Sequence, residues 1–305
     1  MRCLVRRKLR QTGRLSRKSV RLVLLLAGAA LVALVSLGFA VMADAALEWN
    51  RNWPSRHHWL ALLVPPPSLA ALSWLTLRFS PYAGGSGIPQ VIAALSLPLG
   101  RPQIRLVSLQ TIWKIPLTFL GMLAGASVGR EGPSVQVGAA VMLAWSHVCV
   151  RLGVPIRGLQ LQELIAAGAA GGLASAFNAP LAGVVFAIEE LGRGIALRWQ
   201  RRVLIAVLAS GFLVVAVAGN NPYFGRFGGA AFGESMLGWT VLCGLVNGAL
   251  GGVFARLLGK GLAGTLPAAL GKAARQHPLL SAAVMGLLLA VLGLATSGAV
   301  YGTGY

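Results

Sequence analysis

Three long stretches without a charged residue constrain this chain more than any other feature. They are Leu22–Ala43, Val203–Gly219 and Leu279–Tyr301. A helix needs about 20 apolar residues to cross the hydrocarbon core of a bilayer. Charged residues make up 11% of the chain, whereas a soluble domain carries roughly 25%. The sequence therefore predicts an all-α integral membrane protein.

The basic residues that give the chain its formal charge of +20 are distributed as expected in a membrane protein. Nine basic and no acidic residues precede the first apolar stretch: Arg2, Arg6, Arg7, Lys8, Arg10, Arg14, Arg17, Lys18 and Arg21. The positive-inside rule places such a cluster in the cytoplasm. We therefore expect a cytoplasmic N-terminus and no nucleic-acid partner. The same cluster is compatible with contacts to anionic lipid headgroups.

A cleaved signal peptide is the alternative interpretation of the first apolar stretch. Basic residues precede this stretch, and small residues follow it at Ala43–Ala46. However, its 22 residues exceed the usual apolar region of a signal peptide, which has about 7–15. A membrane span is therefore the preferred interpretation.

Glycine and proline interrupt the apolar sequence of the first half of the chain. The breaks fall at Gly84–Pro89, Gly125–Pro133 and Asn178–Gly183, and between Leu106 and Ile188 we expect short apolar pieces. Interrupted helices survive at membrane depth only where protein or a water-filled cavity surrounds them. The pattern is typical of transporters whose helices end near the bilayer midplane. The alternative is that Gly and Pro are simply more frequent in membrane helices.

The first motif is Gly85-Ser86-Gly87-Ile88-Pro89. Proline suits the first turn of a helix, so a helix is expected to begin here. The unpaired N–H groups and the positive end of the helix dipole would then face an anion. The Ser86 hydroxyl could add one donor. The alternative is that Ser86 only caps the helix.

The second motif is Gly129-Arg130-Glu131-Gly132-Pro133. A carboxylate in an apolar membrane region is costly and marks a functional site by default. Glu131 would compete with an anion for the same N–H groups, and its protonation would release it. The alternative is a plain salt bridge between Arg130 and Glu131.

The third motif is Ala176-Phe177-Asn178-Ala179-Pro180-Leu181-Ala182-Gly183, followed by an apolar run that ends at Glu189 and Glu190. Two adjacent acids lie about 100° apart around a helix, so only one of them can face a given cavity. One could load protons from the cytoplasm, and the other could pair with Arg193. A solvated helix end is the alternative.

Together the three motifs, in this order, resemble the filter and helix motifs of the CLC family of chloride channels and transporters. The resemblance runs from the first apolar stretch to the end of the chain. It implies a homodimer in the plasma membrane (the bacterial inner membrane), with an inverted-repeat bundle of broken helices in each subunit. By this resemblance residues 1–21 are a basic cytoplasmic segment, and 22–202 are the first repeat with both filter motifs. Residues 203–305 then hold the last helix of the first repeat and a truncated start of the second.

The resemblance also implies a role for individual residues. Ser86 matches the serine that coordinates chloride, Glu131 the gating glutamate that carries the proton on the outer side, and Glu190 the inner proton-transfer glutamate. The residues expected to hold the anion are Gly85, Ser86, Gly87, Ile88, Pro89, Gly129, Arg130, Gly132 and Pro133. Because both glutamates are present, the resemblance favours exchange of chloride for protons. Chloride is then a substrate, and no cofactor is expected.

The chain departs from the family pattern in two ways. Gln90 stands where the family generally has glutamate after the motif proline. The second-repeat motif Gly-x-Phe-x-Pro and the pore tyrosine are not found, which leads us to expect an incomplete second repeat. A passive chloride channel and a non-transporting remnant stay open as alternatives. An enzyme or a metal site is not expected, since the three cysteines and four histidines lack ligand spacing.

Overall fold

The computed structural model describes residues 2–52, 62–98, 100–153, 159–192, 201–220 and 233–302, and all regular structure in these ranges is helical. In chain order the elements are α1 (Arg2–Asn52), α3 (Pro65–Phe79), the 3-10 helix η1 (Pro81–Ala83), α4 (Ile88–Ser96), α5 (Arg101–Leu106), the 3-10 helix η2 (Leu109–Trp113), α6 (Lys114–Leu123), α7 (Glu131–Arg151), α8 (Leu161–Ala176), α9 (Pro180–Glu189), α10 (Arg201–Ala218), α11 (Glu234–Lys260), α12 (Leu262–Thr265), α13 (Ala268–Gln276) and α14 (Pro278–Ala295). The all-α fold expected from the sequence is confirmed.

Six helical stretches of the described ranges are long and apolar enough to cross a membrane. They are Ser19–Asn50, Gln103–Leu123, Glu131–Arg151, Arg201–Ala218, Met236–Lys260 and Pro278–Ala295. The three apolar stretches predicted from the sequence fall on α1, α10 and α14, although α14 ends at Ala295 and turns replace its expected last residues. The chain is a multi-pass membrane protein.

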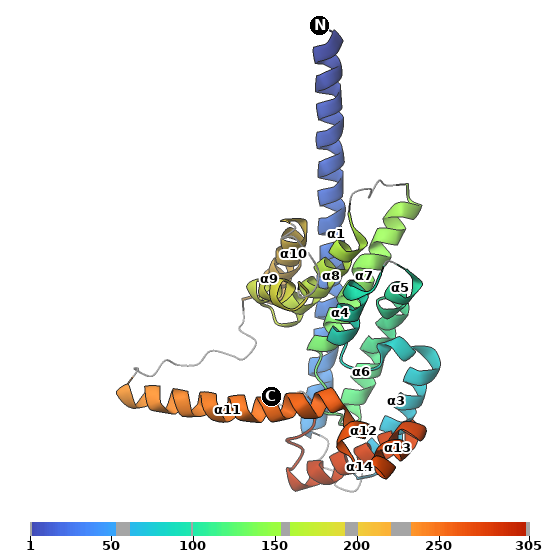
Figure 1. The fold of residues 1–305 in the computed structure, drawn as a ribbon, viewed down its shortest axis with the longest axis vertical. Helices are drawn as coiled ribbons and strands as arrows, with labels where there is room; N and C mark the ends of the chain where they lie inside the picture. The colour runs from blue at the N-terminus through green and yellow to red at the C-terminus, as the bar shows by residue number, and fades with distance from the viewer. Residues whose placement is uncertain are drawn as a thin grey trace.

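The expected segment boundaries do not coincide with breaks in the helices. Helix α1 runs without interruption from the basic segment into the first span, and residue 202 lies in the first turn of α10. Figure 1 shows α1 as the long axis, with α8, α9 and α10 beside one part of it. Helices α1, α7, α8 and α10 pack against one another around a shared core, which includes Val32, Val135, Ile165 and Val207.

Helices α7 and α8 form the centre of the bundle because small residues let their backbones touch. A Cβ atom on Gly138 would overlap the Gly168 carbonyl oxygen, and one on Gly168 would overlap the Gly138 carbonyl oxygen. A Cβ on Gly172 would likewise overlap the Ser134 carbonyl oxygen. Small residues at such crossings are what close helix packing in membranes requires. The glycine- and alanine-rich sequence of α8 thus permits its close contact with α7.

The helices are interrupted where the glycine- and proline-rich motifs predicted. Loops separate η1 from α4, α6 from α7, and α8 from α9, and Pro89 and Pro180 each lie in the first turn of a helix. One expectation was wrong: between Leu106 and Ile188 we expected only short apolar pieces, whereas α7 is continuous over 21 residues. Its two glycines do not interrupt it because each allows a close contact: Gly138 faces α8, and Gly132 faces Ser86 in the loop before α4.

The C-terminal helices are arranged differently from the core. Helix α14 packs against α3, and a Cβ on Gly286 of α14 would lie 2.7 Å from the Pro65 carbonyl oxygen. Pro65 begins α3, so the proline triplet Pro65–Pro67 forms the first turn of this helix. Figure 1 shows α11 as a separate rod, and its described side chains are exposed along its length.

A glycine-to-alanine pair tests the α7–α8 contact. Gly138→Ala is expected to lower the free energy of unfolding by about 1–3 kcal/mol, because a backbone carbonyl cannot move aside as a side chain can. Gly248→Ala on α11 is the control, because an added Cβ there meets nothing within 4 Å. It is expected to leave the free energy of unfolding unchanged or to raise it by up to about 1 kcal/mol. Thermal unfolding of the two variants in one detergent measures the difference, and equal midpoints would contradict the packing described here.

Candidate functional site

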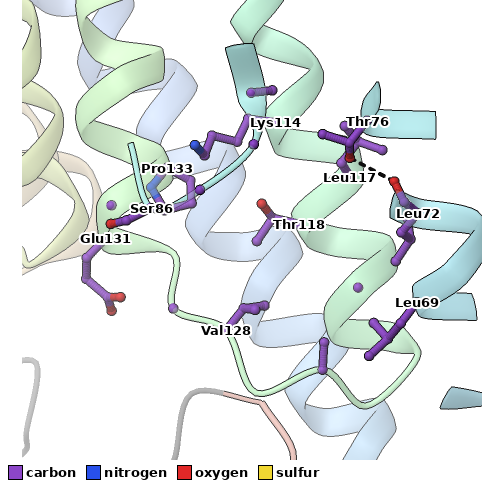
Figure 2. Close-up of a pocket in the computed structure, with 17 residues that line it drawn as sticks. Leu69, Leu72, Thr76, Ser86, Lys114, Leu117, Thr118, Val128, Glu131 and Pro133 are labelled. Carbon is purple, nitrogen blue, oxygen red and sulfur yellow. Dashed lines mark hydrogen bonds between the residues drawn. The ribbon is translucent and has the colours of Figure 1, made fainter. Parts of the chain in front are cut away.

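A cavity of about 560 Å³ brings the first two sequence motifs together. The loop before α4 contributes Gly84, Gly85 and Ser86 to its wall, and the region where α7 begins contributes Gly129, Glu131, Gly132 and Pro133. Helices α3 and α6 complete the lining with mostly apolar side chains, among them Leu69, Leu72 and Leu117 (Figure 2). Four other residues expected at the anion site, Gly87, Ile88, Pro89 and Arg130, do not line this cavity.

The two motifs touch through their backbones. Gly87 has a φ of 115°, and a Cβ on it would overlap the Gly132 carbonyl oxygen. A Cβ on Gly132 would in turn lie 2.6 Å from both the carbonyl oxygen and the hydroxyl of Ser86. Only glycine permits this approach at both positions. The starts of α4 and α7 are therefore held side by side, although more than forty residues separate them in the sequence.

Ser86 does not cap α4. The residue that precedes this helix is Gly87, and no side-chain oxygen of a preceding residue accepts from its first N–H groups. The alternative that Ser86 serves only as a helix cap is therefore wrong. Its exposed side chain belongs to the cavity wall, and its hydroxyl makes no hydrogen bond to any described residue. Ser86 can thus donate to a ligand in the cavity.

Gln90 fixes the shape of the first loop. Its side-chain oxygen accepts from the Gly87 N–H at 2.9 Å, and its amide nitrogen donates to the Gly84 carbonyl oxygen at 2.5 Å. A glutamate carboxylate could make the first of these contacts but could not donate in the second. Glutamine in place of the glutamate of the family pattern therefore gives this loop a second hydrogen bond.

Glu131 opens α7 and is half-buried at the cavity wall. A Cβ on Gly129 would overlap the Glu131 carboxylate, so the carboxylate is folded back over that glycine. Figure 2 shows the carboxylate pointing away from Ser86. Glu131 and Ser86 thus share one cavity while the space beside Ser86 is left to another group.

Arg130 is directed to α1. Its Nη1 lies 2.6 Å from the Asp44 carboxylate and donates to the Ala40 carbonyl oxygen at 3.0 Å. The neighbouring Glu131 is directed to the cavity wall instead. A salt bridge between the two neighbours therefore does not orient the guanidinium, and Arg130 anchors the start of α7 to α1.

Lys114 is a cavity residue that the sequence analysis did not single out. It begins α6, is 3% exposed, and donates from Nζ to the Gln136 side-chain oxygen at 2.7 Å. The Gln136 amide donates in turn to the Tyr82 and Leu106 carbonyl oxygens. The signal was available, because a lone cation in an apolar stretch marks a functional position by default. Lys114 gives the cavity wall a positive charge.

The third motif lies apart from this cavity. Asn178 adopts a φ of 52° between α8 and α9, and its amide donates to the Gly219 carbonyl oxygen at 2.8 Å. Glu189 ends α9 with an exposed side chain, and the next residue, Glu190, is half-buried. Neither lines the cavity that holds Glu131. Arg193, the expected partner of one of the two acids, lies outside the described residues.

The family of this chain follows from its sequence match. The model of the family described as "Voltage gated chloride channel" matches residues 68–305. The chain belongs to this family. The resemblance to the CLC family drawn from the three motifs is therefore confirmed. The cavity lies within the matched region, because its lining begins at Leu69.

Curated relatives of this CLC chain include proton/chloride exchangers. The chain is 35% identical over 208 residues to the H(+)/Cl(-) exchange transporter ClcA of Vibrio cholerae serotype O1, over 66% of this chain and 42% of the relative. It is 40% identical over 138 residues to the protein of that name from Vibrio vulnificus, over 44% of this chain and 27% of the relative. The chain thus spans less than half the length of these relatives.

Two solved structures have a fold similar to that of this chain. A slow cyanobacterial Cl-/H+ antiporter superposes with a TM-score of 0.70 at 24% identity, over 90% of this CLC chain and 64% of the other. A CLC-type fluoride/proton antiporter superposes with a TM-score of 0.59 at 21% identity, over 92% of this chain and 66% of the other. The CLC-type helical architecture expected from the motifs is confirmed by these likenesses.

Gln90→Glu tests the loop geometry. Above the pKa of the introduced carboxyl, the variant loses the donor to the Gly84 carbonyl, which is expected to lower the free energy of unfolding by about 0.5–1.5 kcal/mol. Protonation at low pH restores a donor, so the deficit relative to the parent should shrink on acidification. Gln90→Ala loses both contacts and should show a deficit that does not depend on pH. Thermal unfolding at pH 7.5 and 4.5 measures both variants, and a pH-independent deficit in Gln90→Glu would contradict the assigned hydrogen bonds.

Proposed function

We propose that this chain provides the chloride site and proton-transfer groups of a proton-coupled chloride antiporter. The observation that carries the proposal is the single cavity lined by Ser86 and Glu131 in a chain of the CLC family. One relative of this chain, ClcA of Vibrio cholerae, is named an H(+)/Cl(-) exchange transporter. Exchange is therefore the activity that family and cavity support together.

The anion is held mainly by dipoles. The N-terminal ends of α4 and α7 meet at the Gly87–Gly132 contact, so the positive ends of two helix dipoles converge there. Ser86 offers a hydroxyl donor to the cavity. Helix N-termini bind anions through N–H groups without a full charge, which favours release as well as binding. Lys114 adds a cation, but its contact with Gln136 keeps the ammonium partly engaged.

Glu131 acts as the outer gate in this proposal. Its carboxylate can rotate about its side-chain bonds from its place over Gly129 towards Ser86, because both line the same cavity. When it is ionised it competes with chloride for the helix N-termini, and when it is protonated it leaves them. Chloride and the ionised carboxylate thereby exclude one another at one site, so that protonation of Glu131 favours chloride binding.

Glu190 accepts protons from the other side. It follows α9 and stands outside the cavity of Glu131, so the proton and the anion would use different routes on that side. The basic N-terminal segment favours a cytoplasmic N-terminus. In this proposal the protein is a homodimer in the bacterial inner membrane that takes chloride and protons as substrates and needs no cofactor.

Reconstitution of the chain into chloride-loaded proteoliposomes tests the exchange. Chloride efflux is expected to drive proton uptake, and Glu131→Ala should leave chloride efflux while reducing the proton flux at least about tenfold. Glu190→Ala should likewise lose proton flux. The adjacent Glu189→Ala is the matched control, because its side chain is exposed, and it should keep both fluxes. A chloride electrode and a pH electrode record the two fluxes together.

Three outcomes would contradict this proposal. Chloride flux without proton flux in the parent chain would indicate a passive channel. No flux of either ion in the parent, with correct insertion, would indicate a chain that does not transport by itself. Chloride flux unaffected by replacing Ser86 and Glu131 together would show that the anion passes elsewhere.

A further inference from the structure

A second cavity of about 350 Å³ lies between α1 and α10. Three arginines line it, Arg21 from α1 and Arg201 and Arg202 from the start of α10. It is separate from the cavity of Ser86 and Glu131, since no residue lines both. The proposed exchange makes no use of these arginines.

The positive charge of this second cavity is only partly neutralised. Arg202 lies 3.5 Å from the carboxylate of Glu163, which is buried at the start of α8. No ion pair to Arg21 or Arg201 is found among the described residues. The Arg21 Nε is buried and has no hydrogen-bond partner in the described part of the chain. A buried guanidinium nitrogen without an acceptor is unfavourable, so the cavity is suited to an anionic acceptor.

The cavity lies where two membrane spans begin. The uncharged runs of α1 and α10 begin at Leu22 and Val203, directly after Arg21 and Arg202. The two helices pack against each other, as the core and Figure 1 show. Arginines at the start of an apolar run are suited to the depth of lipid phosphates.

Apolar side chains form the other part of the wall. Leu22, Leu25 and Ile205 line the same cavity within about one helical turn of the arginines. A free inorganic anion would gain nothing from these side chains. A phospholipid would use both parts, with its phosphate at the guanidinium groups and the first carbons of its chains against the leucines and the isoleucine.

We propose that the cavity between α1 and α10 binds the phosphate of an anionic phospholipid. Guanidinium groups form paired, charge-assisted hydrogen bonds with phosphate oxygens. Basic pockets between membrane helices are suited to anionic headgroups. The bound lipid bridges Arg21 of α1 and the first turn of α10, and Glu163 keeps Arg202 in place through their ion pair.

Titration of the purified full chain in neutral detergent tests this site. Short-chain phosphatidylglycerol is the probe, short-chain phosphatidylcholine controls for the acyl chains, and inorganic phosphate at matched ionic strength controls for the anion alone. Phosphatidylglycerol is expected to bind most tightly. Arg21→Gln combined with Arg201→Gln should raise its Kd by about tenfold or more, since each basic residue contributes about fivefold at a membrane surface.

Two further double variants distinguish lipid binding in this cavity from general electrostatic attraction between the lipid and the basic chain. Arg256→Gln with Arg275→Gln removes the same charge from exposed positions on α11 and α13 and should leave the Kd unchanged. Arg21→Lys with Arg201→Lys keeps the charge and should retain most of the binding, which guards against a fold defect in the glutamine pair. An equal loss in the Arg256 and Arg275 pair, or no loss in the Arg21 and Arg201 pair, would overturn the proposal. Inorganic phosphate binding as tightly as phosphatidylglycerol would show a soluble anion, not a lipid, to be the ligand.

Discussion

The contact between Gly87 and Gly132 is the interaction on which the rest of the site depends. Helices that end inside a bilayer leave N–H groups unpaired, and lipid cannot accept their hydrogen bonds. Two such ends can persist only if they face each other across a polar cavity. The missing side chains at these two positions let α4 and α7 approach closely enough to enclose one. The cavity and the close approach of the two helix starts thus have the same origin.

The surrounding contacts hold the two helix starts in place. Gln90 closes the loop before α4 through Gly84 and Gly87, and Arg130 ties the start of α7 to Asp44 of α1. The glycine contacts between α7 and α8 fix the other end of α7 in the core. These contacts fix the backbone on both sides of Glu131, as the proposed rotation of its side chain requires. A gate that moves by side-chain rotation alone needs such a rigid frame.

The two charged cavities use basic residues differently. At the first cavity Lys114 donates to Gln136, and the anion contacts that we propose come from helix dipoles, which suits a ligand that must leave quickly. At the second cavity three arginines gather around a space with apolar walls, which suits a ligand that stays. The difference follows from chemistry, because several guanidinium groups bind a phosphate far more tightly than backbone amides bind a halide.

The sequence by itself determined the membrane class, the places where helices break and the family. Uncharged runs, glycine and proline are local features whose physical consequences in lipid do not depend on distant residues, so the starts of α4 and α9 could be read directly. It also indicated Ser86 and Glu131 through their motifs. Only the tertiary structure decided which side chains meet. The partner of Arg130 lies 86 residues away, and the spacing of the motifs does not reveal that Gly132 touches Ser86. The role of Lys114 and the basic cavity between α1 and α10 depend on the same kind of long-range packing, which no local pattern encodes.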